Sequence, residues 1–172
     1  CRPSAKVIGV APGVKEVRTE SGGVKYDVLN LIPPQRAGTI AVQADLVGAD
    51  KRWCEVSHTT YESVKAPGVH VIGDATIGLP VPKPGTVANA MGKICATAVA
   101  ALPSNRPVPP LAPINTCYSW VNDREAIAVV NAYRIDGGKV VQIEQKLTPA
   151  QTASVGERAV GWAQSIWADM LA

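Results

Sequence analysis

The chain has 172 residues, a length that suits one domain or two small ones and allows a buried core. Its formal net charge is +3 and its basic residues are scattered, which does not suggest a nucleic-acid partner. No apolar run is long and pure enough to predict a transmembrane segment. The four cysteines form no C-x-x-C pair and have no histidine cluster nearby, so no metal site is predicted.

The first 32 residues alternate short apolar runs with turn residues. This pattern predicts a small β-meander with strands over 6–10, 14–19, 24–26 and 28–32, and it would suit the tail of a larger domain. Pro33 and Pro34 end the last of these strands. A short helix over 35–46 and a strand over 53–56 are predicted next.

The stretch from Val69 to Ala75 predicts the element around which a ligand site is built. The short run between Gly68 and Gly73 suits a strand covered on both faces, with His70 as a structural histidine. Asp74 then follows the carboxyl end of that strand, where open α/β sheets bind ligands.

A helix over 86–102, rich in small residues, is predicted to point its N-terminus into the same crevice. A flavin dinucleotide suits such a site because it offers hydroxyls to a carboxylate and anionic oxygens to a helix N-terminus. Tight packing in a protein core would account equally well for the small residues of this helix.

Residues 102–114 contain five prolines and predict a stiff connector and a domain boundary. Strands are predicted beyond it over 117–121, 126–134 and 139–145, and the last two are joined by the hairpin-type turn Asp136-Gly137-Gly138. Thr148 is predicted to cap a C-terminal helix, with Pro149 and Gln151 in its first turn. Apolar residues at helical spacing continue through 155–170.

Five stretches together carry a resemblance to a known family. They are residues 30–38 (NLIPPQRAG), residues 69–75 (VHVIGDA), Pro82-Lys83, the helix over 85–101, and residues 115–119 (NTCYS). From about residue 6 to its end, the chain resembles the carboxyl-terminal part of the flavin-binding subunit of flavocytochrome c sulfide dehydrogenase, including its single-chain relatives in sulfur oxidation.

The resemblance implies an α/β (α+β) chain that forms the end of a flavoprotein fold with two dinucleotide-binding domains. Residues 1–32 would be a remnant of the second nucleotide-binding-like domain, 33–102 the carboxyl-terminal part of the FAD-binding domain, and 103–172 an interface or cap domain. The sequence contains no G-x-G-x-x-G fingerprint and starts without an initiator methionine or signal peptide. We therefore expect a fragment that binds FAD weakly or not at all and is inactive alone.

In such proteins the segment equivalent to Gly73-Asp74-Ala75 binds FAD, and the aspartate accepts a hydrogen bond from a ribityl hydroxyl. Backbone N–H groups near Gly85 and Thr86 would stabilise negative charge on the reduced flavin.

The resemblance also implies roles for two side chains. Lys83 would add a positive charge near the flavin, with a solvated loop lysine as the alternative. Cys117 matches the redox-active cysteine, which pairs in a disulfide with a second cysteine from the amino-terminal half. From the sequence alone, a cysteine at the start of a strand more often serves in packing.

The implied activity is oxidation of sulfide through that disulfide and FAD, with electrons passed to a c-type cytochrome subunit or a soluble cytochrome in the periplasm. One alternative is a sulfide:quinone or NADH:quinone oxidoreductase of the same superfamily, if the stretch around Trp162 and Trp167 docks on a membrane. The helical spacing favours core or flavin-side packing for these two tryptophans. The other alternative is a non-catalytic module in which residues 103–172 dock a cytochrome.

Overall fold

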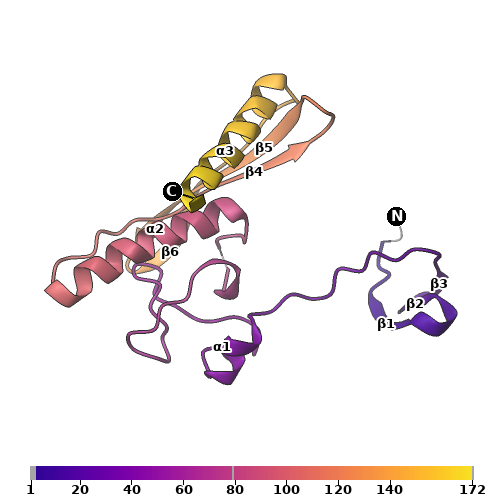
Figure 1. Cartoon of the computed structure of the whole chain (residues 1–172), viewed down its shortest axis with the longest axis horizontal. Helices are drawn as coiled ribbons and strands as arrows, with labels where there is room; N and C mark the ends of the chain where they lie inside the picture. Colours follow the sequence, from indigo (N-terminus) through magenta and orange to yellow (C-terminus); the bar gives the residue numbers. More distant parts are fainter. Residues whose placement is uncertain (1–2, 79, 172) are drawn as a thin grey trace. The chain divides into compact units, whose positions relative to one another are not determined.

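The computed structural model describes residues 3–78 and 80–171, and it divides the chain into two compact units, Cys1–Gln35 and Arg36–Ala172 (Figure 1). The described residues contain two three-stranded antiparallel sheets and several helices. This mixed content confirms the predicted α/β (α+β) class.

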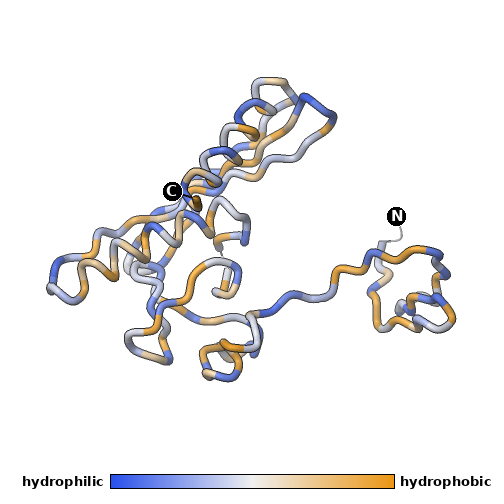
Figure 2. The backbone as a smooth tube through the Cα atoms, in the orientation of Figure 1, coloured by the Kyte–Doolittle hydropathy of each residue, from blue (hydrophilic) through white to orange (hydrophobic). Residues whose placement is uncertain are grey.

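The first unit is an antiparallel meander of β1 (Val7–Ala11), β2 (Glu16–Thr19) and β3 (Gly22–Lys25). A short 3-10 helix, Pro12–Val14, joins the first two strands. The meander is as predicted, but the fourth strand predicted over 28–32 is wrong. This apolar run (Figure 2) has no strand to pair with, and the side chain of Val28 is 91% exposed.

The second unit opens with helix α1 (Thr39–Gln43), which is much shorter than the helix predicted over 35–46. Gly38 is extended at its start, and Asp45 takes a left-handed φ of +52° just beyond its end. The strand predicted over 53–56 is also wrong, because Cys54 and Val56 form only isolated bridges.

The buried strand predicted over 69–72 does not form. Within this run only His70 makes a bridge, to Glu62, and the side chains of Val69 and Ile72 are 40% and 43% exposed. The pairing does not extend because Tyr61, next to Glu62, takes a left-handed φ of +58° and turns the neighbouring segment away from an extended path. The Nδ1 atom of His70 lies 2.9 Å from the carbonyl oxygen of Thr60, which fits the predicted structural role.

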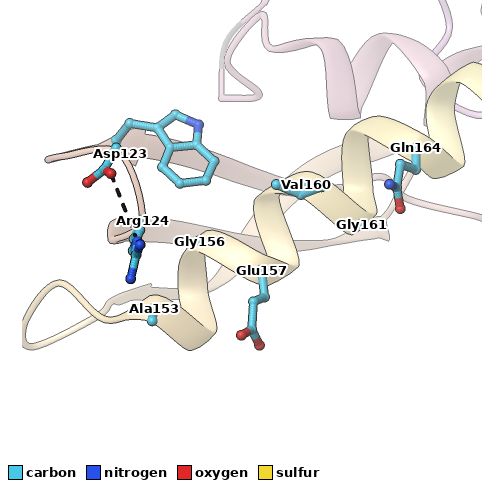
Figure 3. Close-up of a pocket in the computed structure, with 9 residues that line it drawn as sticks. Asp123, Arg124, Ala153, Gly156, Glu157, Val160, Gly161 and Gln164 are labelled. Carbon is cyan, nitrogen blue, oxygen red and sulfur yellow. Dashed lines mark ion pairs between the residues drawn. The ribbon is translucent and has the colours of Figure 1, made fainter.

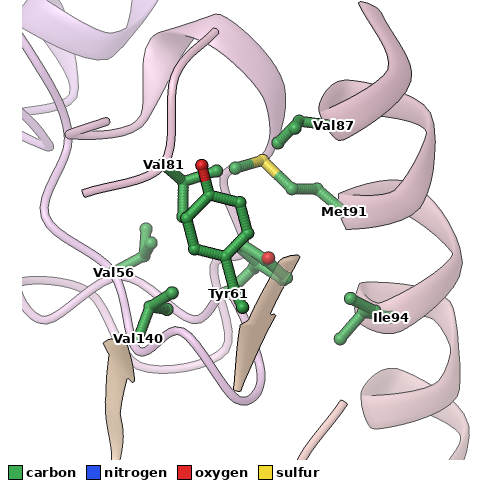
Figure 4. Close-up of a cluster of buried hydrophobic side chains, with 8 residues drawn as sticks. Val56, Tyr61, Val81, Val87, Met91, Ile94 and Val140 are labelled. Carbon is green, nitrogen blue, oxygen red and sulfur yellow. The ribbon is translucent and has the colours of Figure 1, made fainter. Parts of the chain in front are cut away.

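Helix α2 (Gly85–Ala101) confirms the predicted helix and supplies much of the core. Its side chains Val87, Met91 and Ile94 pack around Tyr61 (Figure 4), and two residues of the second sheet, Tyr133 and Val140, join the same cluster. By length and composition, the segment Gly85–Ser104 is also apolar enough to cross a membrane. One such helix is weak evidence for a membrane span, because the core helix of a soluble protein meets the same criterion, so the expectation of no transmembrane segment stands apart from this weak candidate.

The second sheet contains β4 (Ile114–Trp120), β5 (Ala126–Asp136) and β6 (Lys139–Leu147) in that order. All three strands were predicted, and Gly137 and Gly138 form the turn between the last two with φ values of +55° and +77°. Helix α3 (Ala153–Leu171) packs on β4 and β5 (Figure 1), while α2 contacts β4.

The start of α3 differs from the prediction in one respect. The hydroxyl of Thr152, not that of Thr148, caps the helix by accepting a hydrogen bond from the backbone N–H of Val155 at 3.2 Å. The Thr148 hydroxyl instead accepts one from the backbone N–H of Ala128. The assignment of 33–102 and 103–172 to separate parts of a larger enzyme stays a prediction.

Candidate functional site

The Gly73-Asp74-Ala75 segment forms a single 3-10 turn that lies against α2. Gly73 has a φ of +67°, and a Cβ atom added to it would lie 3.6 Å from the Cβ of Ala88 in the first turns of the helix. Glycine is therefore favoured here by the left-handed turn, whereas the contact with Ala88 would be an ordinary van der Waals contact for a Cβ atom. The side chain of Asp74 is exposed at this turn, where its carboxylate could accept a hydrogen bond from a ligand hydroxyl.

Lys83 is not a solvated loop lysine. Its ammonium group donates hydrogen bonds to the carbonyl oxygens of Asp74, at 2.7 Å, and of Thr76. The same nitrogen lies 3.8 Å from the centre of the Trp53 ring, a cation–π contact. Partial burial lowers the pKa of Lys83, although the carboxylates of Asp74 and Asp50 act in the opposite direction. Lys83 thus fastens the Asp74 turn to the loop that precedes α2.

The N-terminus of α2 is open to an anionic ligand. Pro84 is the N-cap residue, no side chain caps the helix, and no acidic residue lies in its first turn. The positive end of the helix dipole is therefore not offset by a carboxylate of the first turn.

A cavity of about 350 Å³ lies at this helix N-terminus. Three elements line it: the start of α2, strand β4 and the middle of α3. The lining residues are Pro84, Gly85, Thr86, Thr116, Cys117, Tyr118, Trp120, Ala159, Trp162 and Ala163. Three of the predicted site residues, Gly85, Thr86 and Cys117, thus meet at one cavity.

The other predicted residues lie apart from this cavity. Gly73, Asp74, Ala75 and Lys83 do not line it, but the Gly73 turn contacts the first turns of the same helix. The N-terminal part of α2 is the element shared by both groups. An elongated ligand that follows this helix end would suit such an arrangement.

A short chain of hydrogen bonds joins α2 to Cys117. The Thr86 hydroxyl donates to the side-chain oxygen of Asn115 at 3.2 Å, and the Cys117 thiol donates to the same oxygen at 3.4 Å. The backbone N–H of Thr116 donates to the Thr86 hydroxyl at 3.4 Å. The Asn115 side chain is 1% exposed, so these contacts replace water as its partners.

Asn115 was not among the predicted site residues. Alternate residues of a strand face the same side, so its position two residues before Cys117 was the available signal. Tyr118 was also missed. Its ring centre lies 6.3 Å from that of Trp162, and both rings line the cavity.

The two tryptophans of α3 have different environments. Trp162 is half-buried at the cavity, in agreement with the packing predicted for it. Trp167 is 63% exposed, so the prediction that it packs in the core is wrong for the part of the chain that the structure describes.

None of the described cysteines, Cys54, Cys95 and Cys117, forms a disulfide within the described residues. Burial raises the pKa values of the Cys54 and Cys95 thiols, as expected for cysteines that serve in packing. Across residues 3–78 and 80–171, no group of three or more His, Cys, Asp or Glu residues could hold a metal ion.

Comparison with known proteins gives one family match. Residues 109–171 match the family model described as "Flavocytochrome c sulphide dehydrogenase, flavin-binding". The matched segment spans β4, β5, β6 and the whole of α3, and it includes Asn115, Cys117 and Trp162. The resemblance predicted from sequence is confirmed for this part of the chain, and the flavin-binding description agrees with FAD as the predicted cofactor of the parent protein.

Proposed function

We propose that this chain is the carboxyl-terminal part of an FAD-dependent sulfide dehydrogenase in which Cys117 is the redox-active cysteine beside the flavin. The family match at 109–171 supports a flavin-dependent oxidoreductase. The observation that carries the proposal is the cavity at which Cys117 meets the N-terminus of α2.

The residues around the cavity suit a flavin ring. The N-terminus of α2, at Gly85 and Thr86, would stabilise negative charge on the reduced ring through its backbone N–H groups and dipole. Tyr118 and Trp162 offer flat apolar faces. Asp74 would accept a hydrogen bond from a ribityl hydroxyl, and Lys83 would hold the Asp74 turn in place. Bound FAD would supply an acceptor for two electrons.

The proposed role of Cys117 follows thiol–disulfide chemistry. A hydrosulfide ion would attack the disulfide between Cys117 and a cysteine from an upstream segment. The S–S bond would break, one sulfur would become a persulfide, and the other would leave as a thiolate. The thiolate and the deprotonated persulfide would then join through a new S–S bond, giving a trisulfide bridge, and the two electrons released by that bond formation would pass to the flavin. The electrons would then pass to a c-type cytochrome, and the compartment would be the periplasm.

A quinone reductase is the second candidate, because the end of α3 exposes apolar side chains. Trp167, Met170 and Leu171 are 63%, 70% and 84% exposed. Such residues on an amphipathic helix would suit contact with a membrane surface, which is where a quinone acceptor lies.

Flavin content and electron acceptor together test the proposal. The complete parent protein, expressed with flavin available, should show flavin absorbance that sulfide bleaches, and oxidised cytochrome c should restore it. Restoration by a short-chain quinone alone would favour the second candidate. A protein without flavin absorbance or sulfide-dependent bleaching would contradict both and favour the non-catalytic module.

The 172-residue chain provides a separate test. We expect weak or absent FAD binding, because the sequence contains no Gly-rich fingerprint for the pyrophosphate. Tight stoichiometric binding of FAD in an equilibrium titration would contradict this expectation.

A further inference from the structure

We infer that Asn115 is a positioning residue whose carboxamide holds the Cys117 sulfur at the N-terminus of α2 and hydrogen-bonds to it in both protonation states. The inference deepens the proposed function and rests on the proposed redox role of Cys117.

Asn115 is placed to act on Cys117 by three features of the structure. The two residues lie on the same face of β4, because they are two positions apart in the strand. The side-chain oxygen of Asn115 lies 3.4 Å from the Cys117 sulfur and 3.2 Å from the Thr86 hydroxyl. Thr86 belongs to the first turn of α2, so the amide links the thiol directly to the helix end.

Burial of the polar Asn115 side chain is unfavourable by itself, so it has to be offset by hydrogen bonds. The Asn115 side chain is 1% exposed, and a buried polar group destabilises the fold unless it is hydrogen-bonded. An apolar residue would avoid that cost in a sheet that contacts both α2 and α3. The carboxamide adds the ability to accept a hydrogen bond on one side and donate two on the other.

The Cys117 thiol needs a hydrogen-bond acceptor, whereas the thiolate needs a hydrogen-bond donor. As a thiol, Cys117 donates its S–H hydrogen to the side-chain oxygen of Asn115. As a thiolate it can only accept, after its proton has passed to solvent. A half-turn of the carboxamide replaces the oxygen with the NH₂ group, which has two hydrogens. One would donate to the thiolate, and the other to the Thr86 hydroxyl oxygen.

The second hydrogen bond is possible because Thr86 keeps a free lone pair in the rotated arrangement. Its hydroxyl oxygen already accepts from the backbone N–H of Thr116, and a hydroxyl oxygen has two lone pairs. Hydrogen bonds to an ionised partner are roughly twice as strong as those between neutral groups. The charge-assisted bond to the sulfur is the basis for the expected effect of Asn115, and in this arrangement the Thr86 hydroxyl no longer donates to Asn115.

Asn131 offers a matched control. Its Cα is paired with that of Asn115 across β4 and β5, and its side chain is also buried, at 6% exposure. The Asn131 side-chain oxygen accepts a hydrogen bond from Gln142 at 3.3 Å and makes none to Cys117. Removing the amide at residue 131 should perturb the same sheet without touching the sulfur.

The test is the pH profile of Cys117 alkylation in the full 172-residue chain, without flavin or sulfide. Iodoacetamide alkylates the thiolate with release of iodide, and peptide mass spectrometry separates Cys117 from the other cysteines. In Asn115→Ala we expect the profile to move to higher pH, with alkylation at neutral pH about tenfold slower. In Asn115→Asp the added negative charge should move it further in the same direction.

Two comparisons keep the test decisive. Asn131→Ala should leave the Cys117 profile unchanged, whereas an equal shift in this variant, or no shift in Asn115→Ala, would overturn the inference. Thermal unfolding checks that each variant is folded. If Asn115→Ala does not fold, Thr86→Val, which removes the other anchor of the amide, should give a smaller upward shift, and an unchanged profile there would overturn it.

Failure of the inference can be told apart from failure of the proposed function. Alkylation does not depend on FAD, so a shifted profile found together with a parent protein that sulfide cannot bleach would reject the redox role of Cys117 while supporting the effect of Asn115 on its sulfur. Normal bleaching together with an unmoved profile would reject the role of Asn115 alone.

Discussion

Gly156 shows at the residue scale how one backbone contact can fix the size of a side chain. It lies in α3 opposite the loop that carries Asp123 and Arg124 (Figure 3), where it lines a groove of about 530 Å³. A Cβ atom at this position would lie 2.1 Å from the carbonyl oxygen of Arg124. The helix and the loop could not both keep their positions with any larger residue.

We therefore predict that Gly156→Ala lowers the free energy of unfolding by about 2–3 kcal/mol, despite the better helix propensity of alanine. Gly161→Ala is the matched control, because nothing lies within 4 Å of a Cβ added there. It should raise the free energy of unfolding by about 0.5–1 kcal/mol. Urea unfolding measures the free energy of unfolding of both variants, and a change of the same sign in the two would refute the packing argument.

Tyr61 predicts a pH dependence of stability at alkaline pH. Burial, with a smaller contribution from Cys95, raises the pKa of Tyr61 from about 10 to about 12, and its side chain is 1% exposed. The folded state holds the phenol proton more tightly than the unfolded state does. The resulting stability is fully present below pH 10 and is lost as the pH rises towards 12.

The expected contribution of this group is about 2–3 kcal/mol. Other groups also titrate in this range, so the measurement is the difference between the wild type and Tyr61→Phe. Between pH 8 and 12 the free energy of unfolding of the wild type should fall by about 2–3 kcal/mol relative to that of the variant, because the variant lacks the phenol. Parallel curves would contradict the assignment.

The residues of the site were only partly predictable, for reasons of geometry. Gly85, Thr86 and Cys117 were found from the predicted helix start and from the resemblance. Asn115 was missed because the role proposed for it depends on a hydrogen bond between a strand and a helix, made by residues 29 apart in sequence. No local sequence pattern indicates such a contact, even though Asn115 lies two residues before Cys117 and therefore on the same face of the strand.

At the scale of elements, local sequence predicted correctly the strands that pair with neighbours close in sequence and the helix that carries a continuous apolar face. The strands over 114–147 pair with their neighbours through short connections, and α2 carries its own apolar face. The run over 69–72 has strand-like residues, but within the second unit it gains only a single bridge. A strand is defined by its neighbours, so its residues alone were insufficient.

The cap of α3 gives a prediction at the same scale. Replacing Thr152 with Ala should lower the free energy of unfolding by about 1 kcal/mol, because the backbone N–H of Val155 would lose its side-chain acceptor. Ser165→Ala, in the exposed middle of the helix, should have almost no effect. Guanidinium unfolding compares them, and equal losses would argue against a capping role.

At the scale of the whole molecule, the buried core belongs to the second unit. All three clusters of buried apolar side chains lie beyond residue 36, and Val17 is the buried apolar residue of the first unit among those described. We predict that residues 36–172 fold alone and keep the thermal transition of the whole chain within about 3 °C, an estimate based on a loss below 1 kcal/mol. Loss of a cooperative transition on removing 1–35 would contradict the division.

The central claim is that Cys117 carries electrons from sulfide to a flavin bound at the N-terminus of α2. The most direct test is stopped-flow reduction of the flavin by sulfide in the complete parent protein, comparing the wild type with Cys117→Ser. Cys95→Ser is a suitable control, since that thiol packs against the core. The account predicts that Cys117→Ser keeps its flavin absorbance but loses rapid bleaching, while Cys95→Ser bleaches normally. Unchanged reduction in Cys117→Ser would contradict the account.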